Sequence, residues 1–203
     1  MSLSRGLQEI FRAISLILYY RVGLRAFFAF EKSGDLIHLL QLVAIVVFAI
    51  ACIRIKFSSK SNSTPRSVVL VFLSLLLPAQ LEIATSLRIF PVIAVILMIT
   101  GSVISLIALI DLGASFDFLP SDKGIVTSGA YQLVRHPIYT GYVTALAGNL
   151  LYNFSAHNLL VTILIWITIY QRASLEEEMQ LISNSEYELY RLKVRFRLFP
   201  GVI

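Results

Sequence analysis

The chain has 203 residues, of which 57% are hydrophobic and 14% are charged, whereas about 25% of the residues of a soluble domain are charged. This composition excludes an ordinary soluble domain and indicates an all-α integral membrane protein with five or six transmembrane helices of about 20 residues each. The net charge is +5, but Lys and Arg gather in short segments beside apolar runs. That pattern indicates membrane topology rather than a nucleic-acid-binding surface, so we expect no nucleic-acid partner.

The first apolar segment, residues 10–30, is interrupted by Arg12, Arg21 and Arg25. Two interpretations are open: a tilted span, or a helix that lies in the membrane interface with its arginines extended toward water. The residues before it show no short apolar core followed by a small-residue cleavage site, so we expect no removable signal peptide.

Three further spans are expected before residue 111, over residues 36–53, 67–87 and 93–110. The only cysteine, Cys52, lies in the first of them and is expected to pack there, which leaves no disulfide framework and no cysteine-based metal site. His38 near the start of that span is expected to be a packing or interfacial residue, and Glu82 an interfacial one. The basic loop at residues 54–66 should face the cytosol by the positive-inside rule.

After residue 111 the composition changes, and we divide the chain there into an N-terminal membrane region, residues 1–110, and a C-terminal region, residues 111–203. A polar loop of about 26 residues comes first, and a loop of that length in a compact protein is usually functional or disordered; its spaced aromatic and aliphatic residues favour order. Residues 137–151 and 159–170 then form an antiparallel helical hairpin, with Gly141 and Gly148 at close-packed positions. The polar C-terminal segment should return to the cytosolic side.

Arg135 and His136 stand directly before Pro137, where the polar loop becomes a membrane helix. Proline suits the first helical turn, which places His136 near the N-cap, where free N–H groups and the helix dipole favour an anion. Tyr139 lies on the same face, three residues on, and Gly141 leaves room beside it. The pattern fits either a site for a small ligand that bears a carboxylate or an ordinary interfacial anchor.

Glu176, Glu177 and Glu178 follow the hairpin, at the end to which His136 also belongs. Carboxylates beside anionic headgroups either solvate a helix end or bind a cation. Together with the anion-favouring helix start, they describe a pocket for a molecule with both charges, such as the amino-acid end of a cofactor.

The stretch "LVRHPIYTGY", the glutamates "EEE" about 35 residues later and the ending "YELYRLKVRFRLFPGV" resemble the signature of the isoprenylcysteine carboxyl methyltransferase family and its phospholipid methyltransferase relatives. The similarity covers residues 112–203. It implies an integral membrane enzyme that uses S-adenosylmethionine in a cytosolic C-terminal pocket, while a lipidic or prenylated substrate enters from the bilayer.

The resemblance also assigns residues. Tyr131, His136 and Tyr139 would line the cofactor site, and Arg135 would brace the loop or meet the cofactor carboxylate. Glu176 and Glu177 would hold the ammonium group, although the run of three glutamates leaves this register open.

Methyl transfer from a sulfonium needs an aligned nucleophile and the exclusion of water. A carboxylate acceptor needs no general base, and Lys193, with Arg197 as a second candidate, would orient it as the family implies. Alternatively, the basic cluster at residues 191–197 contacts the phosphates of membrane lipids.

The predicted activity is therefore carboxyl O-methylation of a C-terminal S-isoprenylcysteine. The alternative is methylation of a phospholipid or another lipid. A membrane reductase that uses NADPH is less favoured, because such enzymes usually follow the tyrosine with Gly-Asp, whereas this chain reads "YTGY".

Overall fold

The computed structural model describes residues 3–54, 57, 61, 63–83, 87–121 and 124–201. Within these residues the regular structure is helical, and the only strand-like pairings are two isolated bridges. The elements in chain order are α1 (Leu3–Ser33), α2 (Leu36–Arg54), α3 (Pro65–Leu76), η1 (Leu77–Gln80), α4 (Pro91–Leu112), η2 (Gly113–Ser115), η3 (Gly129–Gln132), α5 (Pro137–Tyr152), α6 (Ala156–Ser183) and α7 (Glu186–Lys193).

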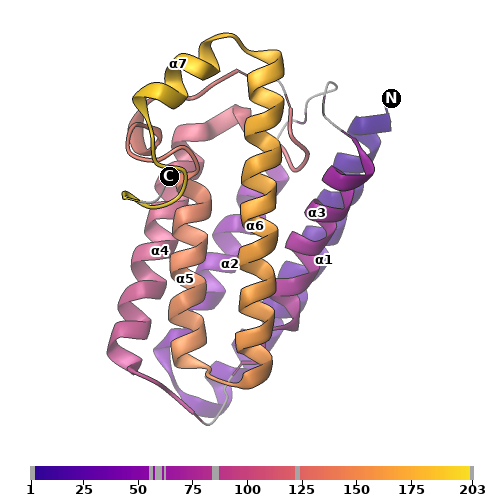
Figure 1. Cartoon of the computed structure of the whole chain (residues 1–203). Coiled ribbons are helices and arrows are strands. Elements are labelled where there is room, and N and C mark those ends of the chain that lie inside the picture. Colours follow the sequence, from indigo (N-terminus) through magenta and orange to yellow (C-terminus); the bar gives the residue numbers. More distant parts are fainter. Residues whose placement is uncertain are drawn as a thin grey trace.

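Helices α1 to α6 run lengthwise in one bundle, and α7 lies across one end of it (Figure 1). The N-terminus of α1 and the start of α3 lie at the α7 end, whereas the turns that join α1 to α2 and α5 to α6 lie at the other. Arg66 in the first turn of α3 approaches Glu178 of α6, with Nη1 3.6 Å from Oε2. The end of the basic loop and the glutamate run therefore share one end of the bundle, as expected.

Three helices of the described chain are long and apolar enough to cross a membrane: Arg5–Ser33, Pro91–Leu112 and Ala156–Ser183. Leu36–Ile50 and Pro65–Gln80 are shorter apolar helices. These helices confirm the all-α membrane class, while the count of five or six spans stays a prediction. Because α1 is continuous through residues 10–30 and packs lengthwise on α2, the structure favours the spanning interpretation of the first segment.

One of the three arginines of this first segment, Arg25, has partners inside the bundle. Pro78 lies in η1, where the α3 helix ends and backbone carbonyls lose their helical partners. The Arg25 guanidinium donates to two of these carbonyls, Ala79 O at 3.0 Å and Leu81 O at 2.9 Å. Arg25 thus supplies hydrogen-bond donors to the carbonyls that the end of α3 leaves without helical partners, which explains how the bundle accommodates this charge.

Helices α4 and α5 make the closest packing in the bundle, through glycines on both. A Cβ on Gly101 would lie 2.5 Å from the Gly141 carbonyl oxygen, and one on Gly148 would lie 2.5 Å from that of Ala94. The predicted α5–α6 hairpin is present, with three residues between the helices. Its glycines, however, face α4 rather than α6, since a Cβ on Gly141 would lie 2.4 Å from the Gly101 carbonyl oxygen. Small residues on α4 allow this close approach.

A polar cluster closes the end of the bundle opposite α7. Asn158 is fully buried and donates through Nδ2 to the Asn153 carbonyl at 2.6 Å, while its Oδ1 accepts the Glu82 N–H at 2.8 Å. The exposed Glu82 carboxylate accepts a hydrogen bond from the Ser155 hydroxyl at 3.3 Å. Glu82 therefore lies at an end of the bundle, in agreement with the interfacial prediction.

Candidate active site

Helix α5 begins at Pro137 with His136 as its N-cap, as predicted. The backbone N–H groups of Arg135 and His136 do not stay free for an anion. They donate to the carbonyls of Phe196 and Arg197 at 2.9 and 3.0 Å, so the C-terminal tail runs beside the start of α5. The tail is thus part of the site's framework.

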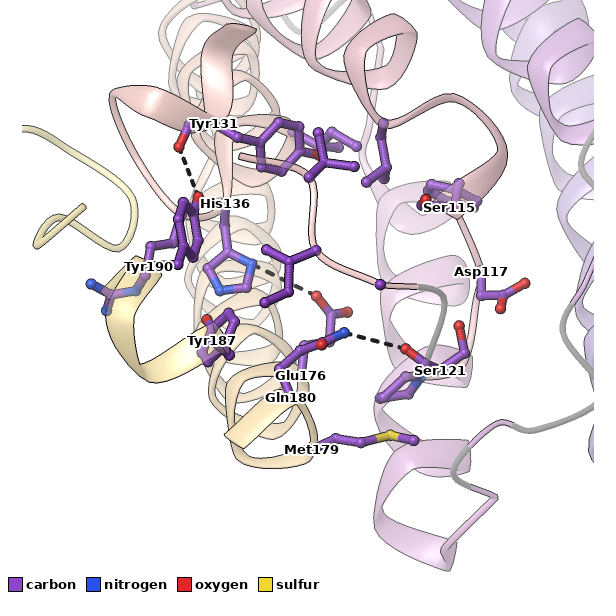
Figure 2. A pocket seen from close by; sticks show the side chains of 18 of the residues that line it. Ser115, Asp117, Ser121, Tyr131, His136, Glu176, Met179, Gln180, Tyr187 and Tyr190 are labelled. Atoms are coloured by element: carbon purple, nitrogen blue, oxygen red, sulfur yellow. Dashed lines mark hydrogen bonds and ion pairs between the residues drawn. The ribbon is translucent and has the colours of Figure 1, made fainter. Parts of the chain in front are cut away.

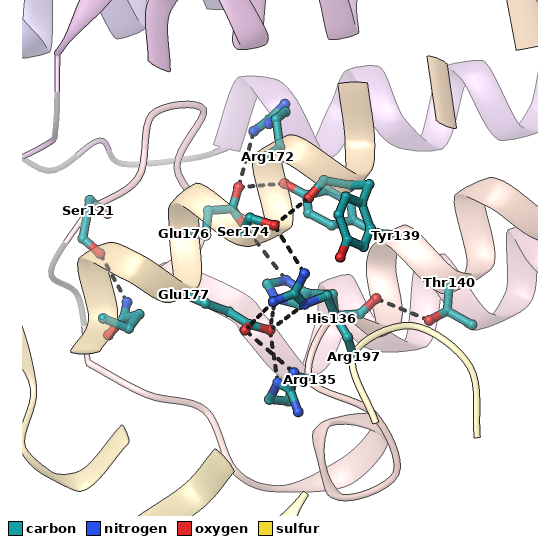
Figure 3. Close-up of polar contacts among 12 residues, drawn as sticks. Ser121, Arg135, His136, Tyr139, Thr140, Arg172, Ser174, Glu176, Glu177 and Arg197 are labelled. Carbon is teal, nitrogen blue, oxygen red and sulfur yellow. Dashed lines mark hydrogen bonds and ion pairs between the residues drawn. The ribbon is translucent and has the colours of Figure 1, made fainter. Parts of the chain in front are cut away.

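Behind the cavity, the Glu177 carboxylate gathers three nitrogen-bearing side chains (Figure 3). Its Oε1 accepts from Arg135 Nε at 2.8 Å and contacts His136 Nε2 at 3.1 Å. Its Oε2 accepts from Arg197 Nη2 at 3.0 Å. Because Glu177 is only 3% exposed, these contacts replace the water that its charge would otherwise need.

Arg135 braces the tail as well as Glu177. Its Nη1 donates to the carbonyls of Val194 at 3.0 Å and Arg195 at 2.5 Å. Of the two predicted roles for Arg135, these bonds support the bracing of the chain.

The neighbouring Glu176 points to the other side of the same helical turn. Its Oε1 accepts from the Tyr139 hydroxyl at 2.5 Å and lies 3.5 Å from Arg172 Nη2, and its Oε2 lies 3.7 Å from His136 Nδ1. The His136 and Tyr139 rings stack, with their centroids 5.6 Å apart and 9° between their planes. Two consecutive glutamates therefore have different environments, one enclosed by cations and one facing the cavity.

The cavity itself has a volume of about 160 Å³ and lies at the α7 end of the bundle (Figure 2). Its wall includes Glu176 and four tyrosines, which are Tyr131, Tyr139, Tyr187 and Tyr190. Aromatic faces and a carboxylate attract a cation, and the polar loop before η3 closes the opposite wall.

Tyr190 ties α7 to this wall. Its hydroxyl donates to the Tyr131 carbonyl at 2.7 Å, and burial raises the pKa of Tyr190 to about 12. The phenol therefore stays protonated, and able to donate, throughout the physiological range.

The structure brings together five of the predicted site residues on the cavity wall: Tyr131, Arg135, His136, Tyr139 and Glu176. It does not place the other three there. Glu177 lies behind the wall, Lys193 is exposed on the surface of α7, and Arg197 is held by Glu177 and by the Ser174 hydroxyl at 3.0 Å.

Sequence reasoning missed two residues. Arg172 contacts Glu176 and donates to the Ser74 hydroxyl at 2.8 Å and the Phe118 carbonyl at 2.9 Å. Its position four residues before Glu176, at the end of an apolar run, was the available signal.

Gln180 is the second missed residue. It lies on the cavity wall and donates through Nε2 to the Ser121 carbonyl at 3.3 Å, while its buried Oε1 has no partner among the described residues. No motif marks it in the sequence, and only its place one turn after Glu176 connects it to the site.

Residues 89–184 match the model of the phospholipid methyltransferase family. The predicted resemblance is confirmed. The matched stretch runs from just before α4 to just past the end of α6 and contains the start of α5, the cavity-facing Glu176 and the enclosed Glu177.

A relative from Schizosaccharomyces pombe, named protein-S-isoprenylcysteine O-methyltransferase, is 35% identical over 95 residues. The alignment covers 43% of this chain and 40% of the relative, so the chain spans about two fifths of the length of the curated relative that it matches. The phospholipid methyltransferase family match and this relative agree on methyl transfer and differ in the acceptor that their names give.

Proposed function

We propose that this protein is a membrane-embedded methyltransferase that uses S-adenosylmethionine and methylates the carboxylate of a C-terminal S-isoprenylcysteine. The observation that carries the proposal is the cavity at the α7 end of the bundle, where Glu176 and four tyrosines meet within or beside the stretch that matches the family. The name of the Schizosaccharomyces pombe relative supports the acceptor.

The wall of the cavity fits this cofactor in charge. S-adenosylmethionine carries two positively charged groups, an ammonium and a sulfonium. The Glu176 carboxylate and the faces of the tyrosine rings would attract both. One turn further along α6, Gln180 also lines the cavity, and its Oε1, which has no partner among the described residues, offers an acceptor for a hydroxyl or amino group of the nucleoside. Glu177 was predicted to hold the ammonium too, but its three nitrogen partners support a positioning role for it.

The cofactor would supply a methyl group that its sulfonium already activates. The residues of the chain would therefore bind, orient and exclude water rather than move protons. Tyr139 and Arg172 fix the Glu176 carboxylate from two sides. Arg135 and Arg197 fix Glu177, and through Glu177 they hold His136 against the cavity.

The family name supports a second candidate, an amine headgroup of a phospholipid as the acceptor. The two acceptors yield different products, so one assay separates them. The purified protein in lipid nanodiscs is given methyl-labelled S-adenosylmethionine with N-acetyl-S-farnesylcysteine or phosphatidylethanolamine. A carboxyl methyl ester releases labelled methanol in alkali, whereas an N-methyl group does not.

We expect alkali-labile label on the farnesylcysteine. Alkali-stable label on the phospholipid alone would replace the proposed acceptor by the second candidate. Saturable binding of NADPH without any binding of S-adenosylhomocysteine would overturn the methyltransferase proposal itself and favour a reductase.

We also propose that the cavity faces the cytosol and that the protein crosses the membrane several times. Arg66 at the end of the basic loop and the basic tail lie at the cavity end, in agreement with the positive-inside rule. Single cysteines at Arg191 in α7 and at Val92 in α4, in a Cys52→Ser background, test this placement. An impermeant maleimide added outside intact cells should label position 92 and spare position 191, and the reverse pattern would contradict the orientation.

A further inference from the structure

A second cavity lies deeper in the bundle, in the apolar layer. It has a volume of about 400 Å³ and is lined by residues of α1, α2, η1, α4 and α5. Its wall is formed mostly by aliphatic side chains, and a cavity of this size in a bilayer is large enough to admit a hydrocarbon chain.

Helix α5 lines both cavities with one face. Ile138 lies on the wall of the cavity at the α7 end, and Tyr142, Ala145 and Asn149 lie on the wall of the deeper one. These positions are spaced as i, i+4, i+7 and i+11, which is one stripe of an α-helix. The two cavities therefore follow one another along α5.

Helix α4 repeats this arrangement. Leu112 lines the cavity at the α7 end, while Ser105, Ser102 and Met98 line the deeper cavity on the same stripe of the helix. Since two neighbouring helices both pass from one cavity to the other, the deeper cavity lies next to the candidate active site along the bundle.

The far end of the deeper cavity is polar. Gln41 Nε2 donates to Asn149 Oδ1 at 3.1 Å, and both residues lie on the cavity wall. Fully buried His38 holds the other end of the Gln41 amide, with Nδ1 3.1 Å from Oε1, and Asn153 Nδ2 donates to Asn149 Oδ1 at 3.1 Å. A bonded pair of amides therefore forms the floor of an otherwise apolar cavity.

The depth of this floor is fixed by the helix. Ile138 and Asn149 are eleven residues apart, which is about 16 Å at a rise of 1.5 Å per residue. An apolar chain that reaches beyond the floor would have to separate the Gln41–Asn149 pair and leave buried amide groups without partners, which is unfavourable.

We propose that the deeper cavity holds the hydrocarbon chain of the methyl acceptor, and that the Gln41–Asn149 pair sets the longest chain accepted. This inference rests on the proposed function and adds chain-length selection to it. The acceptor would lie with its carboxylate at the α7 end and its chain end against the amide floor.

The test compares two acceptors, N-acetyl-S-farnesylcysteine and N-acetyl-S-geranylgeranylcysteine, whose chains differ by one isoprene unit. In nanodiscs, the wild type should show a higher kcat/KM with the farnesyl acceptor. Asn149→Ala removes half of the floor. It should raise the ratio of kcat/KM for the geranylgeranyl acceptor to kcat/KM for the farnesyl acceptor, by roughly fourfold for each methylene that the enlarged cavity takes in. Gln41→Ala removes the other half of the floor, which belongs to α2, and should raise the same ratio.

Leu106→Ala is the matched control. Leu106 lines the cavity on α4, toward its α7 end, so this change widens the cavity without deepening it. Both acceptors should lose kcat/KM by the same factor, and their ratio should stay that of the wild type. Binding of S-adenosylhomocysteine reports whether each variant is folded.

The inference and the proposed function fail separately. Methyl transfer with equal kcat/KM for both chains, or an unchanged ratio in both floor variants, would overturn the inference and leave the function intact. If neither acceptor is methylated, the proposed function is wrong. The shift in thermal unfolding temperature that each acceptor causes then measures binding to the deeper cavity directly. Stronger stabilisation by the farnesyl compound in the wild type, lost in Asn149→Ala, would still support the inference, and equal stabilisation in both proteins would overturn it.

Discussion

Arg135 and Glu177 form an enclosed ion pair, with Nε 2.8 Å from Oε1 and side chains 4% and 3% exposed. They come from the loop before α5 and from the last part of α6, two segments about forty residues apart. Because Arg197 and His136 meet the same carboxylate, Glu177 joins the loop, α6 and the C-terminal tail.

Replacing Glu177 should therefore lower stability before it affects any ligand. Glu177→Gln leaves the buried Arg135 and the half-buried Arg197 without a counter-charge, and losing one partner of a buried pair costs about 3–5 kcal/mol. We expect a clear fall in the thermal unfolding temperature in detergent. Glu178→Gln is the control, because the exposed pair of Glu178 with Arg66 contributes roughly 0–1 kcal/mol. Equal unfolding temperatures for the two variants would contradict the joining role of Glu177.

Changes at Glu176 and its partners should weaken ligand binding as well as stability, because this carboxylate faces the cavity. Tyr139→Phe removes a hydrogen bond to a carboxylate, which contributes about 1.5–3 kcal/mol. We expect S-adenosylhomocysteine to bind roughly tenfold to hundredfold more weakly by calorimetry, and Glu176→Gln to bind it more weakly still.

Tyr170→Phe tests whether this effect is specific. Tyr170 is 54% exposed, and the Arg197 guanidinium lies 5.1 Å from its ring centroid, a contact that Phe keeps. The affinity of Tyr170→Phe for S-adenosylhomocysteine should equal that of the wild type. Wild-type affinity in Tyr139→Phe would show that the Glu176 carboxylate is not part of the cofactor site.

The basic residues at the C-terminus should differ from one another. Lys193 is exposed and lies outside the cavity wall, so Lys193→Ala should keep kcat/KM close to the wild-type value. Arg197→Ala loses its bonds to Glu177 and Ser174 and should reduce both stability and turnover. Arg195→Ala is its control, because Arg195 contributes its backbone carbonyl to Arg135 and its side chain is exposed. A large loss of turnover in Lys193→Ala, without a loss of stability, would restore the predicted role of Lys193.

Local signals predicted the start of α5 and the placement of His136 and the glutamates of α6 at the same end of the bundle. The rule that proline begins a helix needs only neighbouring residues, and the return of the hairpin brings residue 176 back to the same end. The tail was beyond such reasoning, because backbone bonds between residues about sixty apart, such as Arg135 N–H to the Phe196 carbonyl, leave no periodic pattern. For the same reason, Lys193 and Arg197 looked alike in sequence although only Arg197 points inward.

The packing of α4 on α5 gives the last prediction. The missing side chain of Gly101 lets the backbones touch, so Gly101→Ala would place a Cβ 2.5 Å from the Gly141 carbonyl oxygen and force the helices apart. Overpacking of this kind costs about 1–3 kcal/mol, and because α4 and α5 line both cavities, ligand binding should weaken together with stability. Gly23→Ala is the matched control. Its Cβ would meet the Leu42 side chain at 3.6 Å, an ordinary contact, and alanine is the better helix former by up to about 1 kcal/mol. Thermal unfolding should therefore rank Gly23→Ala at or above the wild type and Gly101→Ala well below it; equal values for the two variants would show that α4 and α5 can separate without cost.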